Sequence, residues 1–172
     1  MVLCKMSIAV LVAAGAAAIG TTALAQGAAP STGTHIKKAP PAVERGRYLA
    51  RIAGCNDCHT PGYLLNAGNV PEDQWLTGDT LGWRGPWGTT YASNLREKML
   101  KMSEGEWLKY AKTVELRPPM PWFTFRHMTD ADLRAIYRFV AYLGPGGKPA
   151  PDYVPPNQEP KPPYVTFPAP PK

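Results

Sequence analysis

Cysteine and histidine are both scarce in this 172-residue chain, which contains three of each. Cys4 lies in the first 25 residues, so Cys55 and Cys58 form the only pair in the rest of the sequence. A structural zinc site needs four ligands, usually in two close pairs. His35 and His127 supply no second pair, so the sequence argues against structural zinc.

The chain also lacks an apolar run long enough to span a membrane. Its longest candidate, "SIAVLVAAGAAAIG", is shorter than the roughly 20 residues of a spanning helix. Lys5 before this run and the A-x-A pattern ending at Ala25 are typical of a secretory signal. We expect residues 1–25 to be a signal peptide cleaved near Ala25 and the protein to be periplasmic, with membrane contact only through partners or an uncleaved signal.

No run of like charges is present, although the net charge is +6. The basic residues are interspersed with acidic ones, which argues against a nucleic-acid partner. They fit either a rim that steers an acidic protein or an ordinary solvated surface. The positions in question are Arg45, Arg47, Arg51, Arg84, Arg96, Lys98, Lys101, Lys109, Lys112, Arg117 and Arg126.

What is present is the stretch "GCNDCHTPG", residues 54–62. A redox dithiol should follow a strand, but the residues before Cys55 have helical spacing, and a simple disulfide leaves His59 unexplained. A covalent haem uses all three side chains: two thiols three residues apart reach the two vinyl groups, and the histidine faces the iron. We therefore predict one haem c, attached through Cys55 and Cys58.

Helical periodicity runs from Val43 to the cysteines and resumes in two later segments. Ser103 and Glu106 form a capping-box pattern at the start of one, and Thr129 and Gly144 delimit the other. Residues 60–94, rich in glycine, proline and aromatics, are expected to form a long ordered loop, and no strand is predicted.

Two segments outside these helices have little tendency to form regular structure. Residues 26–41 are small and polar and predict a flexible leader. Residues 145–172 contain 11 of the 20 prolines and predict an extended tail. Tyr153, Tyr164 and Phe167 are expected to pin this tail to the domain surface, while docking to a partner stays open as the alternative.

The second axial position of the iron decides between electron transfer and chemistry on a small ligand. Met120 lies in "PPMP", where prolines hold the chain extended and reduce the entropy lost on binding, so His59 and Met120 are the predicted iron ligands. Arg84 and Trp87 are candidate hydrogen-bond donors to a haem propionate.

The stretches "RGRYLARIAGCNDCHTPG", "MPW" and "MTDADLRAIYRFVAYLGP" resemble a class I c-type cytochrome with one haem. The similarity covers roughly residues 43–144 and is strongest to the cytochrome c modules of periplasmic alcohol and sugar-acid dehydrogenase cytochrome subunits. It implies an all-α cytochrome c fold over residues 42–144, with three to five helices around the haem and long loops rich in glycine, proline and aromatics. It also places the iron-binding methionine at Met120 and makes Pro71 a candidate for the carbonyl that holds the proximal imidazole.

The expected function is one-electron transfer by Fe(III)/Fe(II) cycling rather than catalysis. Expected partners are redox proteins: a dehydrogenase as donor, and an oxidase or another cytochrome as acceptor. Two alternatives stay open: a haem-binding subunit of a larger dehydrogenase or oxidase complex, or a haem enzyme or sensor with an open sixth position.

Overall fold

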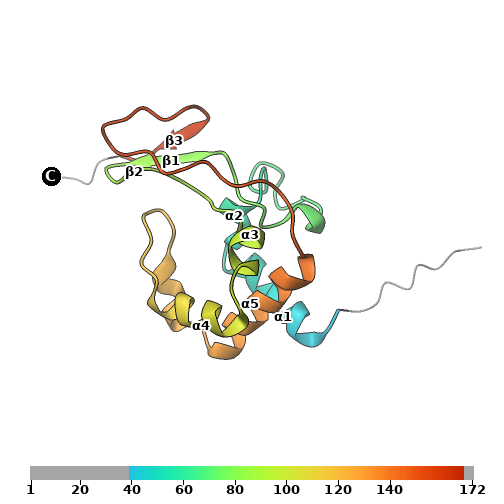
Figure 1. Cartoon of the computed structure of the whole chain (residues 1–172). Coiled ribbons are helices and arrows are strands. Elements are labelled where there is room, and N and C mark those ends of the chain that lie inside the picture. The colour runs from blue at the N-terminus through green and yellow to red at the C-terminus, as the bar shows by residue number, and fades with distance from the viewer. Residues whose placement is uncertain (1–38, 169–172) are drawn as a thin grey trace, which may run out of the picture. The chain divides into compact units, whose positions relative to one another are not determined.

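The computed structural model describes residues 39–168, which are mostly helical with one small sheet. Figure 1 shows the order of elements, with the sheet at one end of this part and α4 and α5 at the other. This arrangement agrees with the predicted cytochrome c fold. The elements are α1 Pro41–Ile52, α2 Cys55–His59, η1 Glu72–Gln74, β1 Gly82–Gly85, β2 Gly88–Tyr91, α3 Leu95–Leu100, α4 Glu104–Thr113, η2 Trp122–His127, α5 Asp130–Leu143 and β3 Tyr164–Thr166.

The predicted signal peptide, residues 1–25, lies outside the described residues, as do most of the predicted leader and residues 169–172. Within residues 39–168, no helix is long and apolar enough to cross a membrane. The first described helix begins at Pro41, close to the predicted start of the domain at residue 42.

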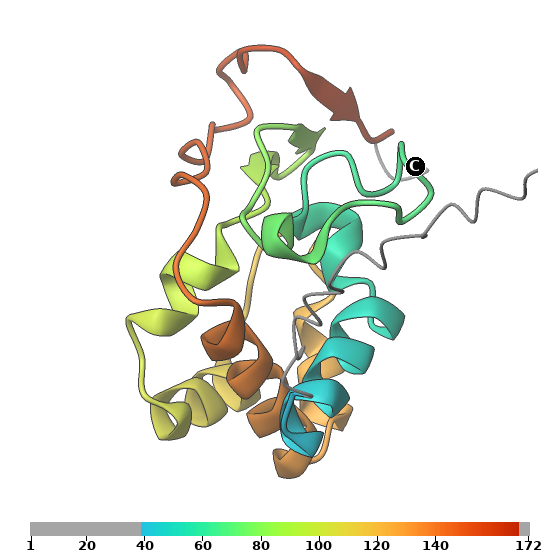
Figure 2. The same cartoon turned by 90° about the vertical axis from the view of Figure 1, so that its right-hand side faces the viewer.

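The first and last helices, α1 and α5, pack side by side, as both views show (Figures 1 and 2). Gly46 makes this close crossing possible. A β-carbon at Gly46 would lie 2.0 Å from the carbonyl oxygen of Ala135 and 2.6 Å from the β-carbon of Phe139. Because such contacts are far below van der Waals distance, only glycine fits here.

The C-terminal end of α5 is held by a buried arginine, Arg96, on α3. Its guanidinium donates to the carbonyl oxygens of Leu143 and Gly144 at 2.6 Å each, and to that of Pro145 at 3.0 Å. It also donates to the carbonyl of Asp73 in η1, at 2.6 Å. The last carbonyls of a helix have no partner within it, so one side chain here caps α5 and joins it to η1.

The helix caps predicted from the sequence are present. Ser103 and Glu106 form a complete capping box at α4, and Thr129 caps α5 by accepting from the backbone of Asp132. The first helix is shorter than predicted, because Gly54 adopts a left-handed conformation with φ 69° between α1 and α2. The two cysteines therefore begin a separate helical turn.

Residues 60–94 contain more regular structure than predicted. Strands β1 and β2 form an antiparallel hairpin, in which Trp83 pairs with Thr90 and Gly85 with Gly88. Strand β3 of the tail adds to β1 in parallel, giving the order β2-β1-β3. The strands went unpredicted because they are three or four residues long, and because one pairing partner lies in the tail, far away in sequence.

The tail packs on the domain, as expected from its three aromatic residues. The hydroxyl of Tyr153 donates to the carbonyl of Trp87 at 2.8 Å, and Tyr164 lies in β3. The ring of Phe167 contacts those of Trp83 and Trp87, with centroids 6.0 Å and 5.5 Å apart. All three tail aromatics therefore contact or extend the hairpin.

Candidate functional site

The two cysteines and the histidine of the motif occupy the single turn of α2. Cys55 and Cys58 are both free and partly buried. The turn is fixed from within: the hydroxyl of Thr60 donates to the side-chain oxygen of Asn56 at 2.8 Å and accepts from the backbone of Leu76, also at 2.8 Å. Because Asn56 and Thr60 are almost fully buried, α2 is a rigid support for the side chains between them.

The imidazole of His59 is held in one tautomer. Its Nδ1 lies 2.7 Å from the carbonyl oxygen of Ser93, and a carbonyl can only accept, so Nδ1 carries the proton. The other nitrogen, Nε2, is left with the lone pair that binds a metal. Burial lowers the pKa of His59, which favours this neutral form.

The carbonyl that holds His59 was expected from Pro71, but in the structure it belongs to Ser93. The Pro71 carbonyl instead accepts from the backbone of Gln74 at 3.0 Å, at the start of η1. Ser93 is fixed by its neighbour Asn94, which caps α3 by accepting from the backbone of Glu97 at 3.0 Å. In the sequence, the Ser93-Asn94 pair before a helical segment indicates a helix cap. It does not reveal the contact of Ser93 with His59, because the two residues lie 34 positions apart.

The thiols of α2 are not activated. Burial raises the pKa of Cys55 to about 11, and burial with the nearby carboxylate of Asp57 raises that of Cys58. Redox and nucleophilic cysteines have lowered pKa values, so this environment is unlike a dithiol oxidoreductase. Residues 39–168 hold no group of three or more His, Cys, Asp or Glu arranged to bind a metal ion.

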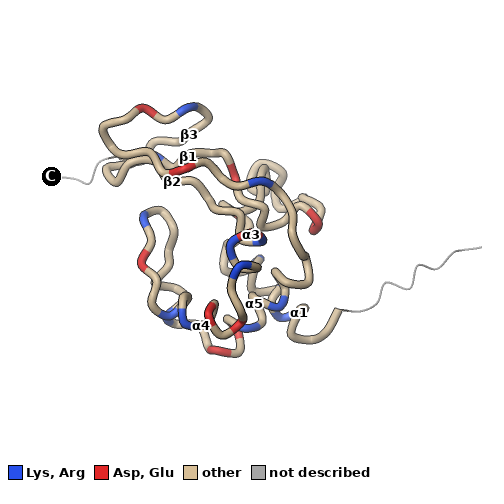
Figure 3. The backbone as a smooth tube through the Cα atoms, viewed as in Figure 1, with Lys and Arg blue, Asp and Glu red and all other residues tan. Residues whose placement is uncertain are grey.

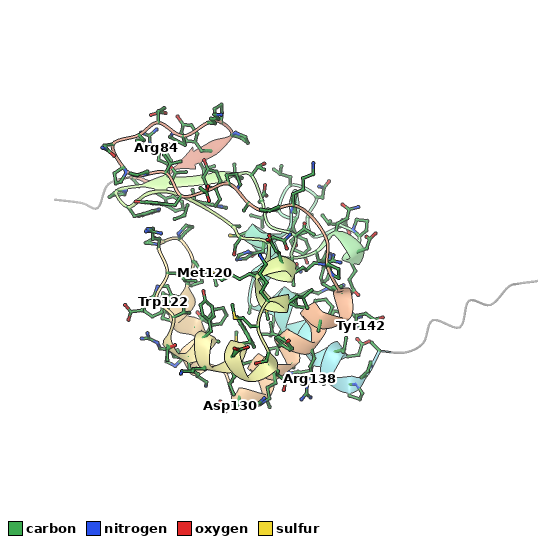
Figure 4. The ribbon with its side chains drawn as sticks, viewed as in Figure 1. Arg84, Met120, Trp122, Asp130, Arg138 and Tyr142 are labelled. Atoms are coloured by element: carbon green, nitrogen blue, oxygen red, sulfur yellow. The ribbon has the colours of Figure 1, made fainter. Side chains whose placement is uncertain are left out.

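Met120 lies on the loop between α4 and η2, residues 114–121, which turns at Pro118 and Pro119 and is named here the Met120 segment. The methionine is partly buried. Figure 4 shows it on the side of the segment that is turned toward α2 and α3. The hydroxyl of Thr90 in β2 donates to the carbonyl of Pro118 at 2.7 Å, so the hairpin supports this segment two residues before the methionine.

The predicted propionate donors, Arg84 and Trp87, are already engaged elsewhere. Arg84 pairs with Glu159 at 2.5 Å and lies over the ring of Tyr164, on the far side of the sheet from Met120 (Figure 4). The indole nitrogen of Trp87 donates to the carbonyl of Trp83 at 3.3 Å. Both side chains therefore already have partners within residues 39–168.

Trp83 was not predicted from the sequence as a hydrogen-bond donor to a haem propionate. Its indole nitrogen is buried and has no hydrogen-bond partner in the structure. Trp83 pairs directly across the hairpin with Thr90, and opposite residues of an antiparallel pair share one face of the sheet. Since Thr90 reaches the Met120 segment, the side chain of Trp83 projects from the face that carries this contact.

The basic residues do not form one patch in this part of the chain. Figure 3 shows blue and red positions interspersed around α4 and along the tail. Several form ion pairs: Arg45 with Asp132, Arg47 with Glu44 and Glu72, Lys101 with Glu97, Lys112 with Asp130, and Arg126 with Glu115. These pairs reduce the net field that such residues would exert on an approaching partner.

Three curated proteins are similar to this chain. One of the subunits of nicotinate dehydrogenase from Pseudomonas putida is 30% identical over 121 residues, covering 63% of this chain and 9% of that protein. The fructose dehydrogenase cytochrome subunit of Gluconobacter japonicus is 28% identical over 131 residues, covering 70% of this chain and 24% of that protein. The cytochrome c subunit of the quinone alcohol dehydrogenase of Gluconobacter oxydans is 32% identical over 140 residues, covering 74% of this chain and 26% of that protein.

The chain thus spans about a quarter of the length of two of these relatives and less than a tenth of the third. No protein-family model matches the chain, and no solved structure matches it.

Proposed function

We propose that this chain is a monohaem c-type cytochrome of class I, a periplasmic one-electron carrier. The observation that carries the proposal is the turn of α2, where two free thiols precede an imidazole whose Nδ1 is committed to the Ser93 carbonyl. This arrangement leaves Nε2 as a metal ligand on the same turn as both attachment points. The similarity to two dehydrogenase cytochrome subunits supports the same function.

Four side chains of this chain would hold the haem. Cys55 and Cys58 would form its two thioether links, His59 would bind the iron through Nε2, and the thioether of Met120 would bind the opposite side. When bound, the haem would supply a one-electron Fe(III)/Fe(II) couple. A neutral thioether favours the reduced iron, so this ligand pair gives a higher potential than two histidines would.

The orphaned indole of Trp83 tests whether the residues fit such a group. An indole N–H can only donate, and leaving one buried without an acceptor costs about 1–3 kcal/mol. Haem carries two propionate carboxylates, which are strong acceptors. We therefore assign Trp83, rather than Arg84 or Trp87, as the donor to a propionate.

The buried, neutral His59 also suits electron transfer. Its proton is fixed at Nδ1 by the Ser93 carbonyl, so the ligand nitrogen needs no proton movement when the iron changes charge. The supporting turn is anchored through Thr60 and Leu76, which limits rearrangement around the ligand. Limited rearrangement lowers the barrier to electron exchange.

The partners we propose are redox proteins of the kind in which the relatives occur. A dehydrogenase would supply the electron, and an oxidase or a further cytochrome would accept it. Export through the signal peptide of residues 1–25 would place the chain in the compartment where cytochromes c mature. We also propose that residues 42–144 form the cytochrome c domain and that residues 145–172 form its tail.

Expression of the full chain with an export and haem-attachment system tests this function. We expect a low-spin spectrum in both oxidation states and a near-infrared band from methionine-to-ferric-iron charge transfer. Met120→Ala should abolish that band while leaving the haem attached. A high-spin ferric spectrum in the wild-type protein would contradict the carrier function and favour a haem enzyme or sensor with an open sixth position.

A further inference from the structure

The tail is bonded to both edges of the β-hairpin. On one edge, Thr89 and Val154 exchange two backbone hydrogen bonds, of 2.7 Å and 3.0 Å. On the other, β3 runs parallel to β1, and the flanking Phe167 N–H donates to the carbonyl of Arg84 at 2.7 Å. In Figure 1 the tail accordingly loops over the hairpin between these two attachments.

Tyr153 is the tail residue that reaches the Met120 segment. The guanidinium carbon of Arg117 lies 3.9 Å from the centroid of the Tyr153 ring. The hydroxyl of the same tyrosine donates to the carbonyl of Trp87 at 2.8 Å. One side chain of the tail therefore touches the hairpin with its hydroxyl and the Met120 segment with its ring.

The hairpin is shaped to admit this tyrosine. Gly88 has φ 96°, a conformation that favours glycine, and a β-carbon there would lie 2.8 Å from the Tyr153 ring and 2.4 Å from the carbonyl oxygen of Val154. The tail thus approaches β2 at a position where a larger residue would exclude it. The contact is part of the close packing rather than a loose surface encounter.

Two contacts from segments distant in sequence thus involve the residues just before Met120. The hydroxyl of Thr90 binds the carbonyl of Pro118, and the ring of Tyr153 lies against Arg117. Thr90 belongs to the hairpin and Tyr153 to the tail, so both of these contacts come from the assembly of hairpin and tail. The methionine follows these two anchored residues by two and three positions.

We propose that Tyr153 is a positioning residue that holds the Met120 segment in place, so that the tail regulates how firmly the iron keeps its methionine ligand. This inference rests on the proposed function, in which Met120 binds the iron. A thioether is a weak ligand, and its hold depends on how strongly the protein confines it near the metal. Removing the anchor at Arg117 lets the segment move and lets external ligands compete more successfully.

The size of the effect follows from the contact that is lost. At an exposed side chain such as Arg117, a cation–π contact stabilises by about 0.5–1 kcal/mol, which corresponds to about a two- to fivefold change in an equilibrium constant. Cyanide binding to the ferric protein measures this equilibrium, because cyanide must displace the methionine. Tyr153→Ala should therefore bind cyanide about two- to fivefold more tightly than the wild-type protein.

Tyr164→Ala is the matched control. Tyr164 is also a tail tyrosine paired with the hairpin, but its side chain contacts Glu159 and Arg84. Arg84 lies on the face of the sheet away from Met120 (Figure 4). If it binds cyanide as the wild type does, the effect of Tyr153→Ala belongs to the contact with Arg117. If both variants bind cyanide equally more tightly, general loosening of the tail is responsible and the positioning role is overturned.

Two further variants keep the inference testable if Tyr153→Ala fails to mature. Arg117→Gln removes the same contact from an exposed side chain and should also tighten cyanide binding. Tyr153→Phe keeps the ring, loses only the hydrogen bond to Trp87, and should lie between the wild type and Tyr153→Ala. Wild-type cyanide affinity in Arg117→Gln would overturn the inference.

Met120→Ala distinguishes a failure of the ligand assignment of Met120 from a failure of the positioning role of Tyr153 alone. If it abolishes the charge-transfer band while Tyr153→Ala and Arg117→Gln bind cyanide as the wild type does, the positioning role fails and the ligand assignment stands. If Met120→Ala leaves the band unchanged, the ligand assignment fails, and the positioning role fails with it.

Discussion

The Nδ1 of His59 and the carbonyl oxygen of Ser93 are 2.7 Å apart, which joins the α2 turn to the residue just before the cap of α3. Asn94, next to Ser93, is almost fully buried, and both ends of its side-chain amide form hydrogen bonds. Its oxygen caps α3, and its amide donates to the carbonyl of Gly146 at 2.7 Å. The support for the imidazole therefore extends through the start of α3 to the first residues of the tail.

Asn94→Ala should destabilise the protein by about 1–2 kcal/mol, because it removes a helix cap. It should also leave the carbonyl of Gly146 without this donor. Chemical denaturation measures the loss. Asn94→Asp keeps the capping oxygen and should be less harmful; equal damage from both changes would mean that the cap contributes nothing.

Gly46→Ala should destabilise by about 1–3 kcal/mol or more, because the added methyl group meets the backbone of α5. The matched control is Gly105→Ala in α4, where a β-carbon would meet nothing within 4 Å. That change should stabilise by about 0.4–1 kcal/mol, since alanine favours helix. Similar results for both glycines in thermal unfolding would refute the close crossing of α1 and α5.

The stability of the protein should fall in acid partly through Glu104. Hydrogen bonds from Arg138 and then Arg134 lower the pKa of this carboxyl below its ordinary value of 4.5. The contribution of ionised Glu104 to the stability of the folded protein is therefore complete above pH 4.5. It is lost as the pH falls through the lowered pKa that this carboxyl has in the folded state. The side chains of Glu104, Arg134 and Arg138 are 25%, 40% and 50% exposed, so the loss should be small.

Glu104→Gln provides the comparison for this acid-induced loss. Its unfolding free energy should lie below that of the wild type at neutral pH, and the difference should shrink as the pH falls below 4.5. Denaturation at a series of pH values measures both curves. A constant difference across the whole range would show that protonation of Glu104 has no part in acid destabilisation.

Trp83→Phe should change the pH dependence of the reduction potential. A hydrogen bond to the charged form of a propionate lowers the pKa of that propionate. Removing the donor should therefore raise this pKa, and with it the pH at which the reduction potential changes, by about one to two pH units. Voltammetry across pH gives the curve. Trp87→Phe is the control, because its N–H already donates to the Trp83 carbonyl, and identical curves for Trp83→Phe and the wild type would exclude Trp83 as the donor.

The parts of the fold that sequence reasoning anticipated are those set by neighbouring residues. The capping box of Ser103 and Glu106 and the cap at Thr129 depend on residues three apart, and the motif at Cys55 lies within five positions. Such patterns are visible in one short window of sequence.

The parts that were missed depend on contacts between distant segments. Strand β1 pairs with Tyr164–Thr166, and His59 finds its carbonyl 34 residues away, so no local pattern could identify either partner. Pro71 was a candidate by resemblance, yet its carbonyl is used within η1. Arg84 and Trp87 were predicted as donors, but Arg84 pairs with Glu159 of the tail and the Trp87 N–H donates to the carbonyl of Trp83.

The mass of the intact, mature polypeptide shows whether a haem is covalently attached to Cys55 and Cys58. After export, purification and denaturation under reducing conditions, we predict the mass of the amino acids plus one haem, and the double variant with Cys55→Ser and Cys58→Ser should lack that addition. A denatured wild-type chain that weighs no more than its amino acids would contradict covalent attachment.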